Sequence, residues 1–353
     1  MRIAIDCRFI GNSGIGTYLD NILNELLNHH TEHDYLLIIR NQTVIDCKRD
    51  NVHVLVCDIK PFSVRDLLFF PVSEVNKCDV FFSPYFNVPL RIKIPVFVTI
   101  HDVIFMDRRE LTSWLGYQMR KLFLKYAIFR SKKIFTVSDF SRRRIVYHFH
   151  LRKEIIVTYN DINFRMKDKC GVNFDPVKKG NYIIYVGNIK KHKGLEVLLS
   201  AYIKAKERGY HNKLYVVGNS DNLRTADEEV SKMVEMDKDI HFTGYVTDDQ
   251  LYNYIKGAQC LVLPSFYEGF GIPPLEALYL GTNVILSDIE VLKEIYSDYP
   301  VTFFKVGDVD GLSEKLLAYE ATSFNCSEIR NKIEKKFDSS IVCSKVLAGL
   351  ESH

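Results

Sequence analysis

The chain has 353 residues, of which 47% are hydrophobic and 26% charged, and its formal net charge is +3. Its length exceeds what one hydrophobic core usually organises, so two domains are expected. The composition is ordinary for a soluble globular protein, and no run of about twenty apolar residues predicts a membrane span. The eight cysteines include no C-x-x-C pair, which argues against a disulfide framework or a zinc site.

In the first half of the chain, short β-rich apolar runs alternate with amphipathic stretches. The first run begins at Met1 and turns polar at Asp6, too soon for a signal peptide. Residues 18–27 have the period of a helix. Such alternation predicts a parallel sheet covered by helices. The predicted strands are 3–5, 35–39, 52–56, 80–82, 96–100 and 133–137.

The same alternation restarts after residue 180. The predicted strands are 182–186, 213–217, 240–242, 260–263, 283–286 and 301–304. Residues 166–180 are polar, contain Gly and Pro and lack a period, which indicates a linker. We therefore predict an α/β fold of two doubly wound, Rossmann-like domains, residues 1–165 and 181–338, whose strand ends face a central cleft.

Glu268 and Glu276 enclose the most informative stretch of the chain. It follows an apolar run and precedes a helical pattern, so it predicts a strand, a glycine-bearing loop and a helix start with proline in the first turn. The loop amides would point with the helix dipole toward a phosphate. Glu268 would accept hydrogen bonds from hydroxyls, and Glu276 would hold a diol such as ribose. The alternative is an ordinary Gly-Pro loop with a dipole-favoured Glu.

Three other strand ends carry candidate binding groups. Gly14 and Gly16 follow the first strand and would let backbone amides approach a phosphate, although such a turn is often only a turn. A lysine-rich run ending at Lys193 precedes a helix and suits a diphosphate; the alternative is a solvated charge run. His101 ends another strand, where ligands meet such sheets, and Asp102 is expected to orient the following loop.

Residues 265–278, Ser-Phe-Tyr-Glu-Gly-Phe-Gly-Ile-Pro-Pro-Leu-Glu-Ala-Leu, resemble the donor-site signature of the glycogen-synthase-like (group 1) retaining glycosyltransferases, the fourth family of these enzymes. The resemblance extends to residues 242–247 and 284–288 and covers nearly the whole chain, in the manner of bacterial polysaccharide and O-antigen enzymes. It implies the GT-B fold, in which the last segment, 339–353, returns as a helix to the N-terminal domain.

The resemblance also implies roles for individual residues. Glu268, His101 and Lys193 would be catalytic, with His101 lining the sugar pocket and Lys193 gripping the diphosphate. Asn188 stands where relatives often have Arg, so Lys190 is expected to supply the missing charge, and Ser13 replaces a glycine. The implied donor-binding residues are Gly14, Ile15, Gly16, Asn188, Lys190, Lys193, Tyr245, Val246, Gly269, Phe270, Gly271, Ile272 and Glu276.

Asp308-Val-Asp310 resembles the D-x-D metal motif of GT-A transferases. Its surroundings favour a helix entrance capped by Asp308 or Asp310. We therefore expect neither a metal nor another cofactor, and the nucleotide sugar is a co-substrate.

Residues 108–144 contain eleven Lys or Arg and two acidic residues. Leu115, Met119, Leu122, Phe123 and Tyr126 form an apolar stripe within this segment. The stripe predicts a helix packed on the core with a solvated basic face. The alternative is docking on an anionic membrane, where lipid-linked acceptors reside.

The resemblance thus implies a metal-independent, retaining hexosyltransferase with a front-face mechanism. It would move a hexose or deoxyhexose, with mannose favoured, from a GDP- or UDP-linked sugar to a glycan or polyprenyl-linked acceptor. A cytoplasmic location is expected, with peripheral contact at the inner face of the plasma membrane, and nucleic acid is not an expected partner. The alternatives are a GT-B sugar-nucleotide 2-epimerase and a non-catalytic sugar-nucleotide-binding subunit.

Overall fold

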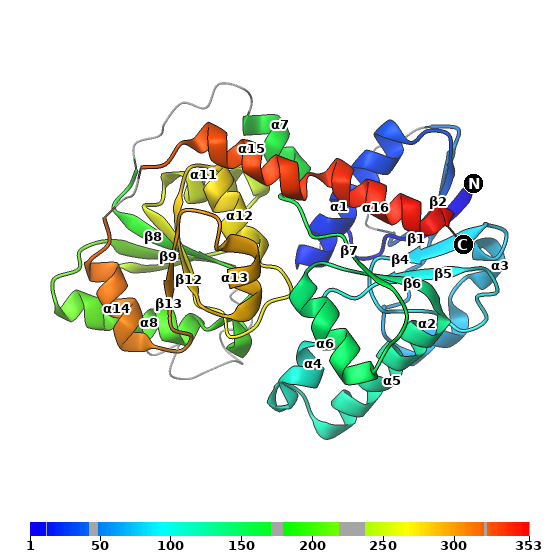
Figure 1. Ribbon diagram of the computed structural model, residues 1–353, viewed down its shortest axis with the longest axis horizontal. Coiled ribbons are helices and arrows are strands. Elements are labelled where there is room, and N and C mark those ends of the chain that lie inside the picture. The colour runs from blue at the N-terminus through cyan, green and yellow to red at the C-terminus, as the bar shows by residue number, and fades with distance from the viewer. Residues whose placement is uncertain (12, 42–48, 171–178, 219–236, 321–322, 353) are drawn as a thin grey trace. The chain divides into compact units, whose positions relative to one another are not determined.

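The computed structural model describes residues 1–11, 13–41, 49–170, 179–218, 237–320 and 323–352. They form two compact units (Figure 1): Met1–Phe164 with Phe337–His353, and Arg165–Lys336. Within the predicted linker, residues 166–170 belong to helix α7, Phe164–Cys170, and residues 171–178 lie outside the described residues.

The N-terminal unit contains a seven-stranded parallel sheet in the order β3-β2-β1-β4-β5-β6-β7. Its central strands β4 and β5 are buried throughout, as expected of strands covered on both faces. The short strand β7 was not predicted from the sequence. The strands are β1 Arg2–Asp6, β2 Asp34–Ile39, β3 Val52–Val56, β4 Val80–Ser83, β5 Val96–Thr99, β6 Ser131–Thr136 and β7 Ile155–Val157.

Helices from both ends of the chain pack on this sheet. α1, Ser13–His29, lies beside α16, Ser339–Glu351 (Figure 1). Gly349 allows the close approach of α16, because a Cβ there would lie 2.6 Å from the Phe135 ring of β6. The other helices of this unit are α2 Val64–Phe69, α3 Val72–Val75, α4 Ile104–Asp107, α5 Trp114–Arg130 and α6 Asp139–Phe149, with a 3-10 turn, η1, at Arg109–Leu111.

A buried charged cluster fixes the segment after β1. The Arg8 side chain has no exposed surface, and its Nε and Nη2 donate to the two carboxylate oxygens of Asp6, at 2.8 and 2.6 Å. Its Nη1 donates to Asp66 Oδ1 of α2 at 2.7 Å. Burial raises the pKa of Asp66, while the Arg8 guanidinium opposes that rise. The cluster joins α2 to the end of β1, and the sequence pattern did not predict it.

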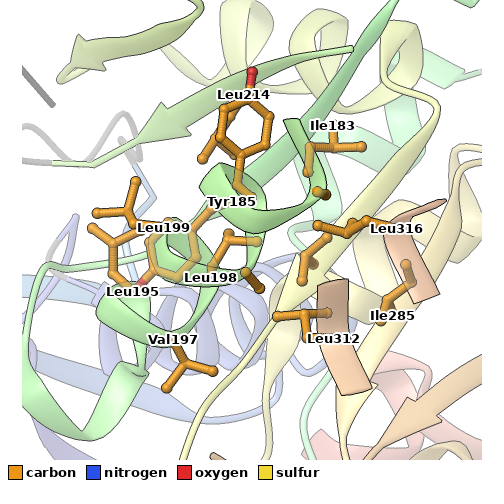
Figure 2. Close-up of a cluster of buried hydrophobic side chains, with 14 of the residues drawn as sticks. Ile183, Tyr185, Leu195, Val197, Leu198, Leu199, Leu214, Ile285, Leu312 and Leu316 are labelled. Atoms are coloured by element: carbon orange, nitrogen blue, oxygen red, sulfur yellow. The ribbon is translucent and has the colours of Figure 1, made fainter. Parts of the chain in front are cut away.

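The C-terminal unit contains a six-stranded parallel sheet in the order β10-β9-β8-β11-β12-β13. On one face, Tyr185 of β8 packs with Leu198 of α8 and Leu312 of α14 in a buried cluster (Figure 2). The strands are β8 Tyr182–Val186, β9 Lys213–Val217, β10 Ile240–Gly244, β11 Cys260–Leu263, β12 Asn283–Ser287 and β13 Val301–Phe304. The helices after α7 are η2 Lys191–Lys193, α8 Leu195–Glu207, α11 Asp248–Gly257, α12 Ile272–Tyr279, α13 Glu290–Tyr296, α14 Val309–Leu317 and α15 Cys326–Phe337.

Helix α5 contradicts the prediction of a core-packed stripe. Leu115, Met119 and Leu122 are 65%, 38% and 62% exposed, and of the predicted stripe only Phe123 is buried. The core contacts come instead from the opposite side of the helix, at Leu124, Ala127 and Ile128. α5 is apolar on two sides, and the sheet covers one of them.

None of the described helices is both long and apolar enough to cross a membrane. Six cysteines lie within the described side chains, and all six are free thiols.

Candidate functional site

In the C-terminal sheet, the order in which successive strands are added reverses between β8 and β11. The chain leaves β8 toward β9 on one side, and later returns to β11 on the other. In parallel sheets, such a switch point opens a crevice at the carboxyl ends of the two strands. The loops that follow β8 and β11 therefore begin at the same place on the sheet edge.

These two loops are packed tightly against each other. The Phe266 amide donates to the His192 carbonyl at 2.8 Å. Gly194 has a φ of +67°, and a Cβ there would lie 2.2 Å from the Pro264 carbonyl oxygen. Only glycine fits this position, because any side chain would both strain the backbone and displace the β11 loop.

Lys193 and Glu268 meet where the two loops join. Lys193 Nζ lies 2.8 and 2.7 Å from the two Glu268 carboxylate oxygens. Ser265 Oγ donates to Glu268 Oε1 at 2.8 Å. The Glu268 side chain is only 7% exposed, whereas that of Lys193 is 23% exposed. A buried carboxylate needs such partners, and the ammonium reaches solvent beside it.

Helix α12 begins next to this ion pair. Gly271 is its N-cap, with a φ of +89°, and Pro273 and Pro274 stand in the first turn, as predicted. The buried Tyr296 hydroxyl donates to the Gly271 carbonyl and holds the turn. The positive end of the α12 dipole therefore lies at the residues predicted to meet an anion, Gly269, Phe270, Gly271 and Ile272.

Glu276 is a buried acid in α12. It is 7% exposed, and among the described residues no group donates a hydrogen bond to its carboxylate. Burial raises its pKa to about 7, and the nearby negative charge of Asp248 adds to the rise. A buried acid without donors is an unfavourable arrangement that hydroxyl groups of a ligand would relieve.

The other predicted donor residues of this unit lie at the same sheet edge but are more open. Asn188 and Lys190 are exposed in the loop after β8. Tyr245, 88% exposed, and the half-buried Val246 follow β10. β10 is three strands from β11, roughly 14 Å at the usual strand spacing. The residues are thus spread along the edge and not gathered at Glu268.

Two supporting residues were not assigned a role from the sequence. Ser265 and Tyr296 hold Glu268 and the α12 entrance, respectively. Ser265 lies three residues before Glu268, so its spacing is a usable signal. Tyr296 lies on α13, and its contact with Gly271 depends on packing that the local pattern does not contain.

In the N-terminal unit, Gly14, Ile15 and Gly16 lie in the first turn of α1. The sequence placed them in a loop before the helix, which is wrong because α1 already begins at Ser13. Gly16 is buried, and a Cβ there would lie 2.9 Å from the Phe9 carbonyl oxygen. The glycine thus lets α1 start directly against the preceding turn.

His101 follows β5 in the same unit. Its Nε2 lies 2.8 Å from the Pro84 carbonyl, which can only accept, so Nε2 carries the proton. Burial lowers the pKa of His101 to about 4, and the Pro84 bond opposes that shift. The ring packs edge-on against Tyr18 at 5.0 Å. At neutral pH, His101 is therefore an uncharged imidazole whose Nδ1 is an acceptor. Asp102 accepts from the Ile104 amide and orients the next turn, as expected.

The Asp308 side chain accepts from the Gly311 amide at 2.9 Å and caps α14, as predicted. Asp310 pairs with Lys204. Within the described part of the chain, no group of three or more His, Cys, Asp or Glu side chains is arranged to hold a metal ion.

The GT-B architecture predicted from the sequence is confirmed by comparison with solved structures. The HepE protein of Anabaena, crystallised with UDP and glucose, matches with a TM-score of 0.74 over the whole of both chains, at 13% sequence identity. At that identity, the match describes the fold.

Part of the chain also matches a known family and several known proteins by sequence. Residues 172–336 match the family described as Glycosyl transferases group 1. O-antigen chain mannosyltransferase B of Escherichia coli is 28% identical over 256 residues, covering 67% of this chain and 64% of that protein. O-antigen chain mannosyltransferase RfbU of Salmonella typhimurium is 30% identical over 207 residues, covering 57% and 54%. The alignments thus span between about half and two thirds of these relatives. The predicted resemblance to group 1 glycosyltransferases is confirmed, and both of these relatives are described as mannosyltransferases, a kind of hexosyltransferase.

Proposed function

We propose that this protein is a retaining, metal-independent glycosyltransferase of bacterial polysaccharide synthesis. It moves a hexose or deoxyhexose from a nucleoside-diphosphate sugar to a glycan or lipid-linked glycan. The observation that carries the proposal is the Lys193–Glu268 pair at the sheet switch point, beside the N-terminus of α12. The preference for a mannose-type donor rests on the two mannosyltransferase relatives.

The proposed chemistry follows from the charges at this site. The diphosphate lies against Lys193 and the positive end of α12, which stabilise the charge that grows on it. Glu268 holds sugar hydroxyls, and Glu276 holds the ribose diol. The bond from C1 to the diphosphate oxygen breaks while the acceptor oxygen bonds to C1 on the same face. The acceptor proton passes to an oxygen of the leaving diphosphate, so the step is balanced without a metal or cofactor.

The proposal includes the place where the enzyme works. A polyprenyl-linked acceptor resides in a membrane, and nucleotide sugars are soluble. We therefore place the protein in the cytoplasm, in peripheral contact with the inner face of the plasma membrane, with no role for nucleic acid.

The test is a panel of GDP- and UDP-linked hexoses offered with polyprenyl-diphosphate-linked glycans. Release of nucleoside diphosphate and formation of a product with the donor's anomeric configuration are expected. Glu268→Gln should lose this activity, and Glu314→Gln, whose side chain is 71% exposed, is the matched control. Donor binding without transfer or hydrolysis would support the binding-subunit alternative. A donor returned with an altered C2 would support the epimerase.

A further inference from the structure

Helix α5 presents a second apolar side to solvent. Leu115, Leu122 and Phe129 are 65%, 62% and 80% exposed. They are seven residues apart, so they lie on one line along the helix, about 21 Å long. Trp114 and Met119 flank this line and are also exposed. We call these five side chains the α5 outer face.

Exposed apolar side chains also occur on α2, an element near α5. Across the described residues of the C-terminal unit, Tyr245 is the one large hydrophobic side chain that is strongly exposed, whereas α2 alone exposes Val64, Leu68 and Phe69. Buried residues that flank α2 and residues of α5 enter the same core on one side of the sheet. Phe62, just before α2, contacts Phe123 of α5, with the ring centroids 6.3 Å apart. Apolar exposure on this scale marks an interaction surface.

The segment of the chain that contains α5 is strongly basic. Residues 108–144 have eleven basic and two acidic residues, a net charge of +9, although the whole chain has only +3. α5 itself contains no acid. Lys121 and Lys125, four residues apart, form no ion pair with any described residue. On a helix, these lysines lie beside Trp114, at the edge of the α5 outer face.

Aromatic and aliphatic side chains with flanking lysines suit one partner above others. A helix with Trp, Phe and Leu on one side and Lys beside them lies in a lipid interface, where hydrocarbon takes the apolar groups and anionic headgroups take the cations. A protein partner with a matching apolar groove would need acids at its rim, and nothing else in the described part of the chain specifies one.

We propose that the α5 outer face docks on an anionic bilayer, with Trp114, Leu122 and Phe129 inserted and Lys121 and Lys125 at the headgroups. This surface deepens the peripheral contact in the proposed function, and it rests on geometry and charge that are independent of catalysis. α5 leads directly into β6 at Ser131, so its first turn lies toward the sheet edge that bears His101. A lipid-linked acceptor would therefore be delivered to that edge.

Trp114 is the only tryptophan of the chain, so its fluorescence reports on this surface without labelling. Vesicles of phosphatidylcholine with one third phosphatidylglycerol should shift the emission of the wild-type protein to the blue, and brominated lipids should quench it. Vesicles of phosphatidylcholine alone should have a much weaker effect, and high salt should reduce binding.

Two variants keep the probe. Leu122→Ser with Phe129→Ser should lower the partition coefficient at least about tenfold. Lys121→Glu with Lys125→Glu should abolish the preference for anionic vesicles. Val54→Ser with Val56→Ser, at exposed positions of β3, is the matched control and should bind as wild type.

All variants should bind nucleoside diphosphate unchanged, so failure of docking and failure of the proposed activity remain distinguishable. An unshifted Trp114 emission with anionic vesicles at low salt would overturn the proposal. A wild-type dimer that becomes monomeric in the Leu122/Phe129 variant would also overturn it, since the face would then be a protein interface.

Discussion

Glu276 of the C-terminal unit and Leu122 of the N-terminal unit are each in surroundings that their side chains usually avoid. The acid is 7% exposed without a described donor, and the leucine is 62% exposed. A buried polar group and a solvated apolar group both carry a free-energy cost in the unliganded protein. Each cost is relieved by a different partner: hydroxyl donors for Glu276 and hydrocarbon for Leu122. The two units therefore expose the chemistry of two ligands.

The two units also differ in net charge. The N-terminal unit, residues 1–164 with 337–353, has 24 basic and 19 acidic residues, whereas residues 165–336 have 23 and 25. The unit with the apolar helix is the cationic one. The unit with the buried glutamates has no excess of basic residues, and the cation that pairs with Glu268 at the candidate site is the side chain of Lys193.

The sharpest test of the outer face compares two leucines of α5. Leu124 is 2% exposed and Leu122 is 62% exposed. Leu124→Ala should lower the free energy of unfolding by about 2–5 kcal/mol, because it leaves a cavity. Leu122→Ala should change it by less than about 0.5 kcal/mol. Denaturation followed by Trp114 fluorescence reports on this unit, and equal losses would mean that the outer face belongs to the core.

Removal of the cation at the switch point should affect turnover more than binding. Lys193→Ala should lower kcat by a factor of roughly a hundred, since one such electrostatic partner contributes about 3 kcal/mol to the transition state. Lys193→Arg should recover part of the rate. Lys204→Ala, at an exposed pair with Asp310, is the control. Steady-state kinetics with the correct donor decide this, and an effect confined to KM would remove Lys193 from the chemistry.

Glu276→Ala should weaken binding of the nucleoside diphosphate. A hydrogen bond to a charged group contributes about 1.5–3 kcal/mol, which corresponds to roughly a 10- to 150-fold change in Kd. Calorimetric titration measures it. An unchanged Kd in a folded variant would show that Glu276 does not bind the ribose diol.

The pH dependence of binding gives a smaller effect. Because the pKa of Glu276 is raised to about 7, the free protein holds a proton there below that pH and loses it above. Hydroxyl donors favour the ionised acid, so affinity should rise about fivefold to tenfold between roughly pH 6 and pH 8. Glu276→Gln should remove that part of the pH dependence. Parallel curves for both proteins would contradict it.

Chelation should have no effect at all. With Asp308 engaged as a helix cap, we expect full transfer activity in EDTA. Inactivation by EDTA that Mg²⁺ or Mn²⁺ reverses would break the metal-free proposal.

The sequence predicted most strands because each parallel, buried strand is a short continuous apolar run, as in 260–263 and 283–286. It missed β7, whose three residues follow the polar stretch 152–154. The sequence pattern also predicted a start of α1 that is too late, because the first residue of this helix depends on the fit of Gly16 against the Phe9 carbonyl. That fit is a tertiary contact without a local signal.

In the candidate site, too, the local pattern predicted some features and tertiary contacts decided others. The topology implied that the loops bearing Lys193 and Glu268 would share one sheet edge, but their direct ion pair was not deducible from residues 75 positions apart. For α5, periodicity identified an apolar stripe and could not decide between two apolar sides. The core took Leu124 and Ile128, and left Leu122 and Phe129 outside.

The position of α16 has a consequence for biosynthesis. This helix follows the whole C-terminal unit in the chain, yet it packs beside α1 and on β6 of the first unit, with Val342, Val346 and Leu350 buried. A ribosome therefore synthesises every strand of the C-terminal unit before it synthesises α16 of the N-terminal unit. The C-terminal unit can therefore fold during translation, whereas the N-terminal unit keeps the part of its surface that α16 covers exposed until α16 has been made.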